Sequence, residues 1–217
     1  MTVIDRLATP LGRRDEVPNQ ELAKEIADSH DAKAVRQLIE NLYNDDQGIA
    51  GDCIKVLYEG GGRNPRLTMR YAKEFGKLLR SKNNRLVWGG MTALDMIAQA
   101  NPEGVHDLIK EILAAAEGGS VIARDHAVGI LVKLASVKEH RDEALRELLA
   151  QLQKCPPNQF PMYVEMAEPA FRESRSEGFS GVLKSRAKEL MKESQKKRVE
   201  KVLRRLSQEQ PQPVKSL

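Results

Sequence analysis

Apolar residues recur with the period of an α-helix along most of the chain. Val35, Leu38, Ile39 and Leu42 follow the spacing i, i+3, i+4, i+7, and the same spacing recurs within residues 105–112. This spacing places apolar side chains on one face of an amphipathic helix. No stretch shows the sustained alternation of apolar and polar residues that is typical of a strand. The pattern therefore predicts an all-α protein.

The helical pattern is also repeated at longer range. Moving residues 71–98 forward by 34 positions places apolar residues on apolar residues, for example Phe75 on Ile109 and Trp88 on Ile122. Shifts of 36 and 40 positions align the neighbouring copies, which indicates loops of slightly different length. The predicted helices are 20–29, then the pairs 32–43 with 47–59, 66–81 with 84–100, 103–117 with 121–137 and 141–153 with 159–170, and a long terminal helix over 181–206.

Local sequence signals agree with several of these boundaries. Asn64-Pro65 and Asn101-Pro102 are typical of an N-cap followed by proline at the first helical position. Ser120 is placed to cap the helix that begins at Val121. The glycine runs 60–62 and 118–119 are expected to end helices by adopting positive φ.

Tandem helix pairs that repeat every 34–40 residues resemble HEAT-type repeats. The resemblance covers residues 32–170 and is clearest in the copies 66–100 and 103–137; armadillo repeats are the related alternative. It implies an α-solenoid whose second helices line a concave face, and a role as a scaffold or partner-binding module. The predicted divisions are an N-terminal extension over 1–19, a repeat domain over 20–170, a basic helical cap over 171–207 and a disordered tail over 208–217.

The net charge of +4 is unevenly distributed. Residues 183–205 carry ten Lys or Arg and three Glu, a net of +7, which leaves −3 for the remainder. This indicates a local basic element and not a uniformly cationic protein. It either caps the last repeat or binds nucleic-acid phosphate, and a membrane is disfavoured because its apolar face lacks Trp or Phe. The candidate basic residues are Lys196, Lys197, Arg198, Arg204 and Arg205.

The sequence offers little support for catalysis. The histidines lack metal-ligand spacing, no nucleophile motif is present, and Cys53 and Cys155 are expected to be buried apolar residues. We therefore predict no cofactor, no small-molecule substrate, no catalytic residue and, without an export signal, a cytoplasmic protein. A remote alternative is an alkylpurine DNA glycosylase of HEAT-like fold, because Trp88 and Asp95 would share one helix face.

A protein partner is the preferred interpretation, and polar residues on the second helices are the candidate contacts. These are Asp52, Lys55, Arg85, Asp95, Arg124 and Lys133. Trp88-Gly89-Gly90 combines one large residue with two glycines, which is typical of a close contact between two helices. We expect Gly89 to permit a tight helix crossing, Trp88 to be buried between repeats, and Gly90 to face outward.

Overall fold

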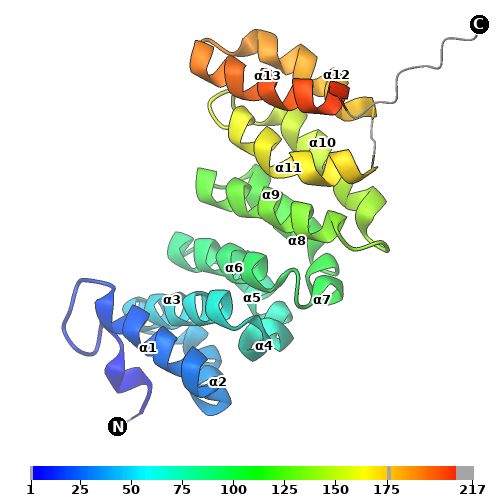
Figure 1. Ribbon diagram of the computed structural model, residues 1–217. Coiled ribbons are helices and arrows are strands. Elements are labelled where there is room, and N and C mark those ends of the chain that lie inside the picture. The colour runs from blue at the N-terminus through cyan, green and yellow to red at the C-terminus, as the bar shows by residue number, and fades with distance from the viewer. Residues whose placement is uncertain (1, 175–176, 209–217) are drawn as a thin grey trace, which may run out of the picture. The chain divides into compact units, whose positions relative to one another are not determined.

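The computed structural model describes residues 2–174 and 177–208, and over these ranges it contains helices and turns but no strand (Figure 1). The all-α prediction is confirmed. The chain divides into two compact units, residues 1–133 and 134–217. Within the described ranges, none of the helices combines the length and the apolar character needed to cross a bilayer.

The N-terminal unit consists of helix pairs that follow one another along the chain. The first helices pack beside second helices, and α6 packs between α3 and α5. The elements are η1 (Ile4–Arg6), α1 (Val17–Ser29), α2 (Ala32–Glu40), η2 (Asn41–Tyr43), α3 (Gln47–Arg63), α4 (Pro65–Thr68), η3 (Met69–Tyr71), α5 (Ala72–Leu78), α6 (Asn84–Ile97), α7 (Pro102–His106), α8 (Ile109–Glu117) and α9 (Val121–Ala135), whose last residues fall in the C-terminal unit.

The segment before α1 is part of the folded unit. Leu7 is fully buried and Ala8 is 4% exposed, so this segment contributes to the core. Helix α1 begins at Val17, three residues before the predicted start, because Pro18 occupies its first turn, where a missing N–H costs no helical hydrogen bond.

The glycine run 60–62 does not end a helix, contrary to the prediction. All three residues lie in the last turns of α3, which continues to Arg63. Gly61 is buried there, and an added Cβ would lie 2.7 Å from the hydroxyl oxygen of Thr68. Tertiary packing therefore holds helical backbone at residues whose intrinsic preference is against it. The run 118–119 does follow the end of α8, but Gly118 has φ −82°, so positive φ is not the reason.

Two predicted first helices are each interrupted. The helix predicted over 66–81 is split into α4, η3 and α5, and that over 103–117 into α7 and α8. The break at Met69 has a visible cause, because its carbonyl oxygen accepts a 2.8 Å hydrogen bond from the side-chain amide of Asn101. The same Asn101 caps α7 by accepting from the N–H of Gly104, as its N-cap signature predicts.

The C-terminal unit also consists of helix pairs. Helix α11 packs with α10 and α13, and α12 packs with α10. The elements are α10 (Arg141–Lys154), α11 (Phe160–Ser174), α12 (Glu177–Arg186), η4 (Ala187–Glu189) and α13 (Glu193–Gln208). The disordered tail expected over 208–217 lies outside the described residues except for Gln208, the last residue of α13.

The prediction of one long terminal helix is wrong. The chain leaves helical structure at Leu190 and resumes it at Glu193, giving α12 and α13. Leu183 and Leu190 are buried on one side of this break, and Val199 and Val202 on the other. At about 100° per residue, Leu190 and Val199 would point in opposite directions on one continuous helix. Burying both apolar stripes therefore requires two helices.

Candidate partner-binding groove

The three residues Trp88-Gly89-Gly90 of α6 point in three different directions. Trp88 is 36% exposed, so the prediction that it is buried between repeats is wrong. Gly89 confirms the tight crossing, since an added Cβ would lie 2.4 Å from Cγ1 of Ile54 on α3. Gly90 is buried against α5, where a Cβ would lie 3.0 Å from the carbonyl oxygen of Phe75, so the prediction that it faces outward is also wrong.

Trp88 lines a groove that crosses the second helices of the N-terminal unit. The groove encloses about 160 Å³. Its most exposed apolar side chains are Trp88 and Ile122, the latter 42% exposed, and Tyr58 adds a half-buried ring. The lining residues are Glu16, Gly51, Ile54, Lys55, Tyr58, Arg85, Trp88, Gly89, Thr92 and Ile122. Apolar side chains from three helices thus meet a charged rim.

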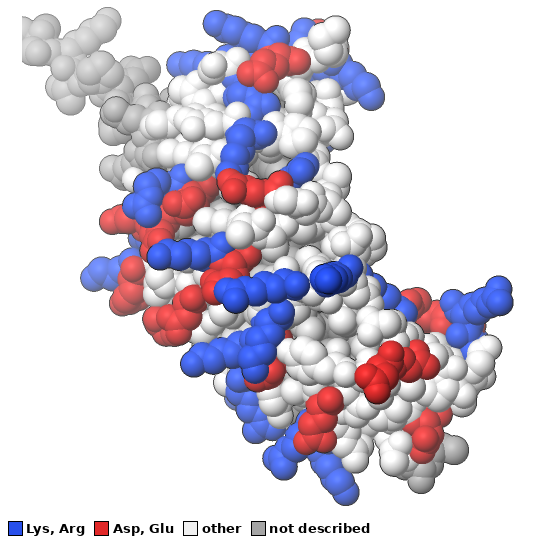
Figure 2. All heavy atoms as spheres, turned by 180° about the vertical axis from the view of Figure 1, so that it is seen from behind, with Lys and Arg blue, Asp and Glu red and all other residues white. Residues whose placement is uncertain are grey.

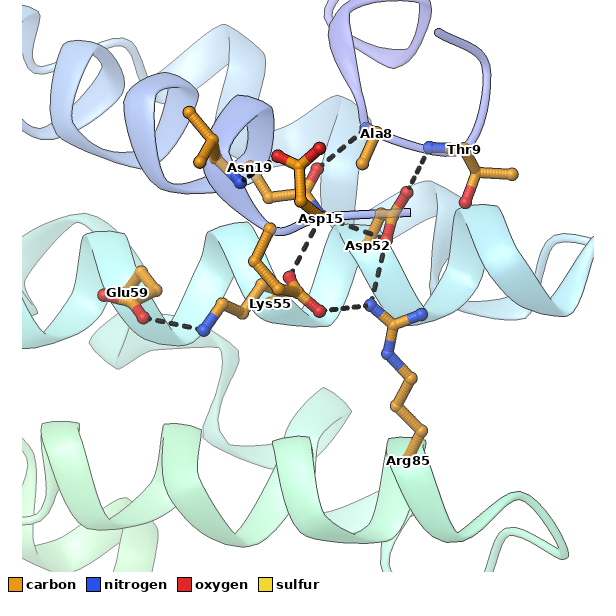
Figure 3. A network of polar contacts seen from close by, with 10 residues as sticks. Ala8, Thr9, Asp15, Asn19, Asp52, Lys55, Glu59 and Arg85 are labelled. Atoms are coloured by element: carbon orange, nitrogen blue, oxygen red, sulfur yellow. Dashed lines mark hydrogen bonds and ion pairs between the residues drawn. The ribbon is translucent and has the colours of Figure 1, made fainter. Parts of the chain in front are cut away.

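Arg85 is held at the rim by two carboxylates. Its Nη2 lies 2.9 Å from Oδ1 of Asp52 on α3 and 3.2 Å from Oε1 of Glu16. Figure 3 shows the guanidinium reaching from α6 towards α3. Gly51 makes this possible, because a Cβ there would lie 2.7 Å from Nη1 of Arg85. The position of Arg85 is therefore set by α3 and by the residue that precedes α1.

Asp52 is the centre of this network (Figure 3). Its side chain is 3% exposed, Oδ2 accepts from the N–H of Thr9 at 2.7 Å, and Oδ1 accepts from the side-chain amide of Asn19 at 3.0 Å. Asn19 in turn accepts from the N–H of Ala8. A buried carboxylate with several donors has its desolvation offset by hydrogen bonds. Asp52 therefore binds the N-terminal segment to α3 and positions Arg85 from beneath the surface.

Lys55, one turn further along α3, forms a separate pair. Its Nζ lies 2.8 Å from Oε1 of Glu59 and 5.0 Å from the centre of the Tyr58 ring. Burial alone would lower the pKa of Lys55, but hydrogen bonds to Glu59 and Tyr58 outweigh burial and raise it. The ammonium is therefore charged at neutral pH and lies beside an aromatic ring of the groove.

Asp95 and Lys133 belong to a second network that joins α6 to α9. Asp95 Oδ2 lies 2.8 Å from Nδ1 of His126, and Oδ1 accepts from Nζ of Lys133 at 2.8 Å. Nε2 of His126 lies 2.9 Å from the hydroxyl of Thr92, which also donates to the carbonyl oxygen of Trp88. A hydroxyl, an imidazole and a carboxylate in this order resemble a nucleophilic relay. However, Thr92 lies inside α6, where backbone N–H groups bond within the helix and offer no oxyanion site.

Arg124 is not brought together with the other candidates. Its guanidinium donates to the carbonyl oxygens of Ala116 and Gly119, each at 3.2 Å, and so fastens the connection between α8 and α9. Of the six polar candidates, Lys55 and Arg85 line the groove, Asp52 lies beneath it, and Asp95 and Lys133 join two of its helices.

In the C-terminal unit, two arginines of the basic helix α13 form ion pairs with α11. Arg198 forms two hydrogen bonds to Glu165, at 2.8 and 2.6 Å, and Arg205 lies 2.7 Å from Glu168. The hydrogen bond from Arg198 lowers the pKa of Glu165. Two other candidates form ion pairs within α13, Lys196 with Glu193 and Arg204 with Glu200. Lys197 is exposed and forms no ion pair with any described residue.

Both cysteines are free and buried, as expected. Burial raises the pKa of Cys53 to about 12 and that of Cys155 to about 11. Neither thiol is therefore a nucleophile at neutral pH. Over residues 2–174 and 177–208, His, Cys, Asp and Glu nowhere form a cluster of three that could hold a metal ion.

The lining residues that the sequence did not single out as contacts include Tyr58, Ile122 and Glu16. The 34-residue shift pairs Trp88 with Ile122, so one signal for the groove was present in the repeat itself. That pairing did not reveal which face the two residues occupy. Glu16 carried no such signal, because its contribution depends on how the N-terminal segment folds onto α3.

The fold is similar to those of several solved structures, including designed armadillo repeat proteins. A designed armadillo repeat protein matches with a TM-score of 0.63 and 13% identity, covering 94% of this chain and 98% of its own. A second, in complex with the peptide (KR)4, matches with a TM-score of 0.63 and 13% identity over 86% of both chains. A crystal structure of an engineered protein matches with a TM-score of 0.61 and 17% identity, covering 96% of this chain and all of its own.

These likenesses confirm the prediction of an α-solenoid of the HEAT and armadillo type. At identities of 13–17% they show the fold alone. No protein-family model matches the sequence, and no curated protein matches it either.

Proposed function

We propose that the chain is a protein-binding module whose N-terminal unit takes an extended segment of another protein into the Trp88 groove. The observation that carries this proposal is an exposed tryptophan in a groove bordered by Tyr58 and Ile122. Tryptophan and tyrosine are enriched among the residues that dominate binding energy at protein interfaces. Their presence on a solvent-exposed groove therefore favours a protein partner.

The size of the groove favours one large apolar anchor residue. Its 160 Å³ is close to the ~150 Å³ of a cavity that accommodates benzene. An aromatic or long aliphatic side chain of the partner would fill it against Trp88. The neighbouring parts of the partner would meet the charged rim formed by Arg85 and Lys55.

The arrangement of the helices favours an extended partner. Packed helices lie about 8–10 Å apart, and an extended chain rises about 3.3 Å per residue. Each step from α3 to α6 to α9 therefore corresponds to about three residues of the partner. A segment of six to nine residues, roughly, would cross the three helices.

The related folds support peptide binding but not a shared peptide sequence. One of the structural counterparts is described as binding (KR)4, and another set as designed for modular peptide recognition. In this chain the rim already carries Arg85 and Lys55, each paired with a carboxylate. A strongly basic peptide is therefore not the preferred ligand. That the groove lies on a concave face of a solenoid remains a prediction.

The test uses a displayed library of random peptides selected against the purified full-length chain. We expect enriched peptides to share one large apolar residue and to lose about 30-fold or more in affinity when Trp88 is replaced by alanine. Tyr43→Ala is the matched control, because Tyr43 is 59% exposed and lies outside the groove in the same unit. Peptides that bind wild type and Trp88→Ala equally well would contradict the proposal.

A further inference from the structure

A second basic element lies in the N-terminal unit, between α3 and α6. Residues 63–82 contain seven Lys or Arg and a single acid, Glu74, a formal net charge of +6. The net charge of the chain outside residues 183–205 is −3, so the positive charge of residues 63–82 is not apparent from that total. The basic residues are Arg63, Arg66, Arg70, Lys73, Lys77, Arg80 and Lys82.

Five of these residues, called the stripe below, follow one another along α4, η3, α5 and the turn after α5. Lys73 and Lys77 are four positions apart and share one face of α5, whereas Arg66 and Arg70 lie on the separate elements α4 and η3 and Arg80 follows α5. All five are exposed, whereas Phe75 and Leu78 on the opposite side are buried. Figure 2 shows blue and red side chains interspersed on this side of the molecule.

Acidic side chains of the protein neutralise only part of the positive charge of the stripe. Lys77 pairs with Glu74 at 2.9 Å and Arg80 with Glu111 at 3.2 Å, in pairs whose cations are more than half exposed. Arg66 and Lys73 form no ion pair with any described residue. Exposed ion pairs contribute little free energy, so both pairs can exchange for a stronger anion.

This arrangement contrasts with the basic helix α13. There, Arg198 and Arg205 hold α13 against α11 through Glu165 and Glu168. Two of its strongest phosphate-binding side chains are thus occupied in maintaining the fold. In the stripe, Arg80 forms a similar pair with Glu111 of α8, but Arg66 and Lys73 form no ion pair with any described residue.

The surroundings of the stripe indicate the kind of partner. None of the exposed large apolar side chains among the described residues belongs to residues 63–82, and the one exposed ring that interacts electrostatically with Lys77 is that of Tyr43. Interfaces with proteins have an apolar core, whereas interfaces with nucleic acids are more polar and strongly positive. We propose that the stripe binds the phosphate backbone of a nucleic acid, independently of base sequence.

The number of cations sets the expected salt dependence. If five side chains neutralise five phosphates of a duplex, log K falls with log[salt] at a slope of about −4.5, and of about −3.5 for a single strand. For the duplex this corresponds to a loss of roughly 500-fold between 50 and 200 mM salt.

The experiment measures binding of the full-length chain to a labelled DNA duplex, its single strand and the matching RNA across this salt range. The test variant is Arg66→Gln/Arg70→Gln/Lys73→Gln. The control is Lys192→Gln/Lys197→Gln/Lys201→Gln, which removes the same charge from exposed positions at or near α13. We expect the stripe variant to lower the slope by about 2–3 and to lose about 100-fold or more in affinity at 50 mM salt, while the control stays within about threefold of wild type.

Three results would overturn the proposal. One is the absence of binding by wild type to every probe at 50 mM salt. Another is loss of binding in the α13 variant while the stripe variant still binds. The third is equal binding of polyglutamate and nucleic acid through the stripe, which would indicate an acidic protein partner. Circular dichroism and thermal unfolding of both variants separate loss of contact from loss of fold.

Discussion

The crossing of α3 and α6 at Gly89 gives the sharpest test of the packing argument. Replacing Gly89 by alanine should stabilise an isolated helix by about 1 kcal/mol, because glycine is the poorer helix former. In the folded protein the new Cβ would lie 2.4 and 2.8 Å from Cγ1 and Cγ2 of Ile54. Ile54 is 1% exposed, so its side chain is surrounded almost completely by packed atoms. In the folded protein, the clash with Ile54 should therefore outweigh the gain in helix propensity, and Gly89→Ala should be destabilising.

Overpacking of a core costs about 1–3 kcal/mol. Subtracting the gain in propensity leaves a net destabilisation of about 0–2 kcal/mol for Gly89→Ala, and of roughly 2–4 kcal/mol for the larger Gly89→Leu. Gly60→Ala is the matched control in the same unit. Gly60 also lies inside a helix, but its added Cβ would meet the carbonyl oxygen of Ala23 at an ordinary 3.7 Å. This control should gain up to about 1 kcal/mol.

Urea unfolding monitored by circular dichroism measures both variants. A second check is the double variant Gly89→Ala/Ile54→Ala, which should cost about 1–2 kcal/mol less than the sum of the single changes, since the clash is removed with the isoleucine. If Gly89→Ala is as stable as Gly60→Ala, the close approach of α3 and α6 is not what requires glycine. Additive single changes would lead to the same conclusion.

Other predictions concern buried and paired side chains. Cys53 and Cys155 should react with a thiol reagent at pH 8 only after denaturation, because burial raises the pKa of both thiols; rapid labelling of the native protein would contradict this. Asp52→Ala should destabilise the N-terminal unit by about 3 kcal/mol in urea unfolding, since it removes the acceptor of the Thr9 N–H and one acceptor each of Asn19 and Arg85; a loss below about 1 kcal/mol would refute this role.

The pair of Glu165 and Arg198 should stabilise the C-terminal unit modestly, and in a pH-dependent way. The folded pKa of Glu165 is lowered, so its contribution is present above the unfolded pKa of about 4.5 and is lost as pH falls through the folded value. Glu165→Gln should therefore remove up to about 1 kcal/mol at pH 7 and nothing at low pH. Thermal unfolding at the two pH values checks this, and an equal loss at both would contradict it.

Local sequence determined the all-α class, the repeated helix pairs and several helix boundaries. Helical periodicity and capping are properties of residues three or four positions apart, and they are visible without a fold. The capping role of Asn101 was predicted for this reason, whereas the position of Gly89 at a crossing was predicted by comparing its segment with the copy 34 residues later. The same local signals were misleading at Gly60–Gly62, where contacts with distant residues keep α3 helical to Arg63.

Only the tertiary structure decided which residues form the groove and which are hidden beneath it. Repeat alignment paired Trp88 with Ile122, but the face on which both are exposed depends on how α3, α6 and α9 pack. Asp52 had the sequence context of a surface contact, and it is buried because Thr9 and Asn19 donate to it from distant parts of the chain. Periodicity gives the side of a helix on which a residue lies, whereas burial and hydrogen bonding depend on the segments that meet that side.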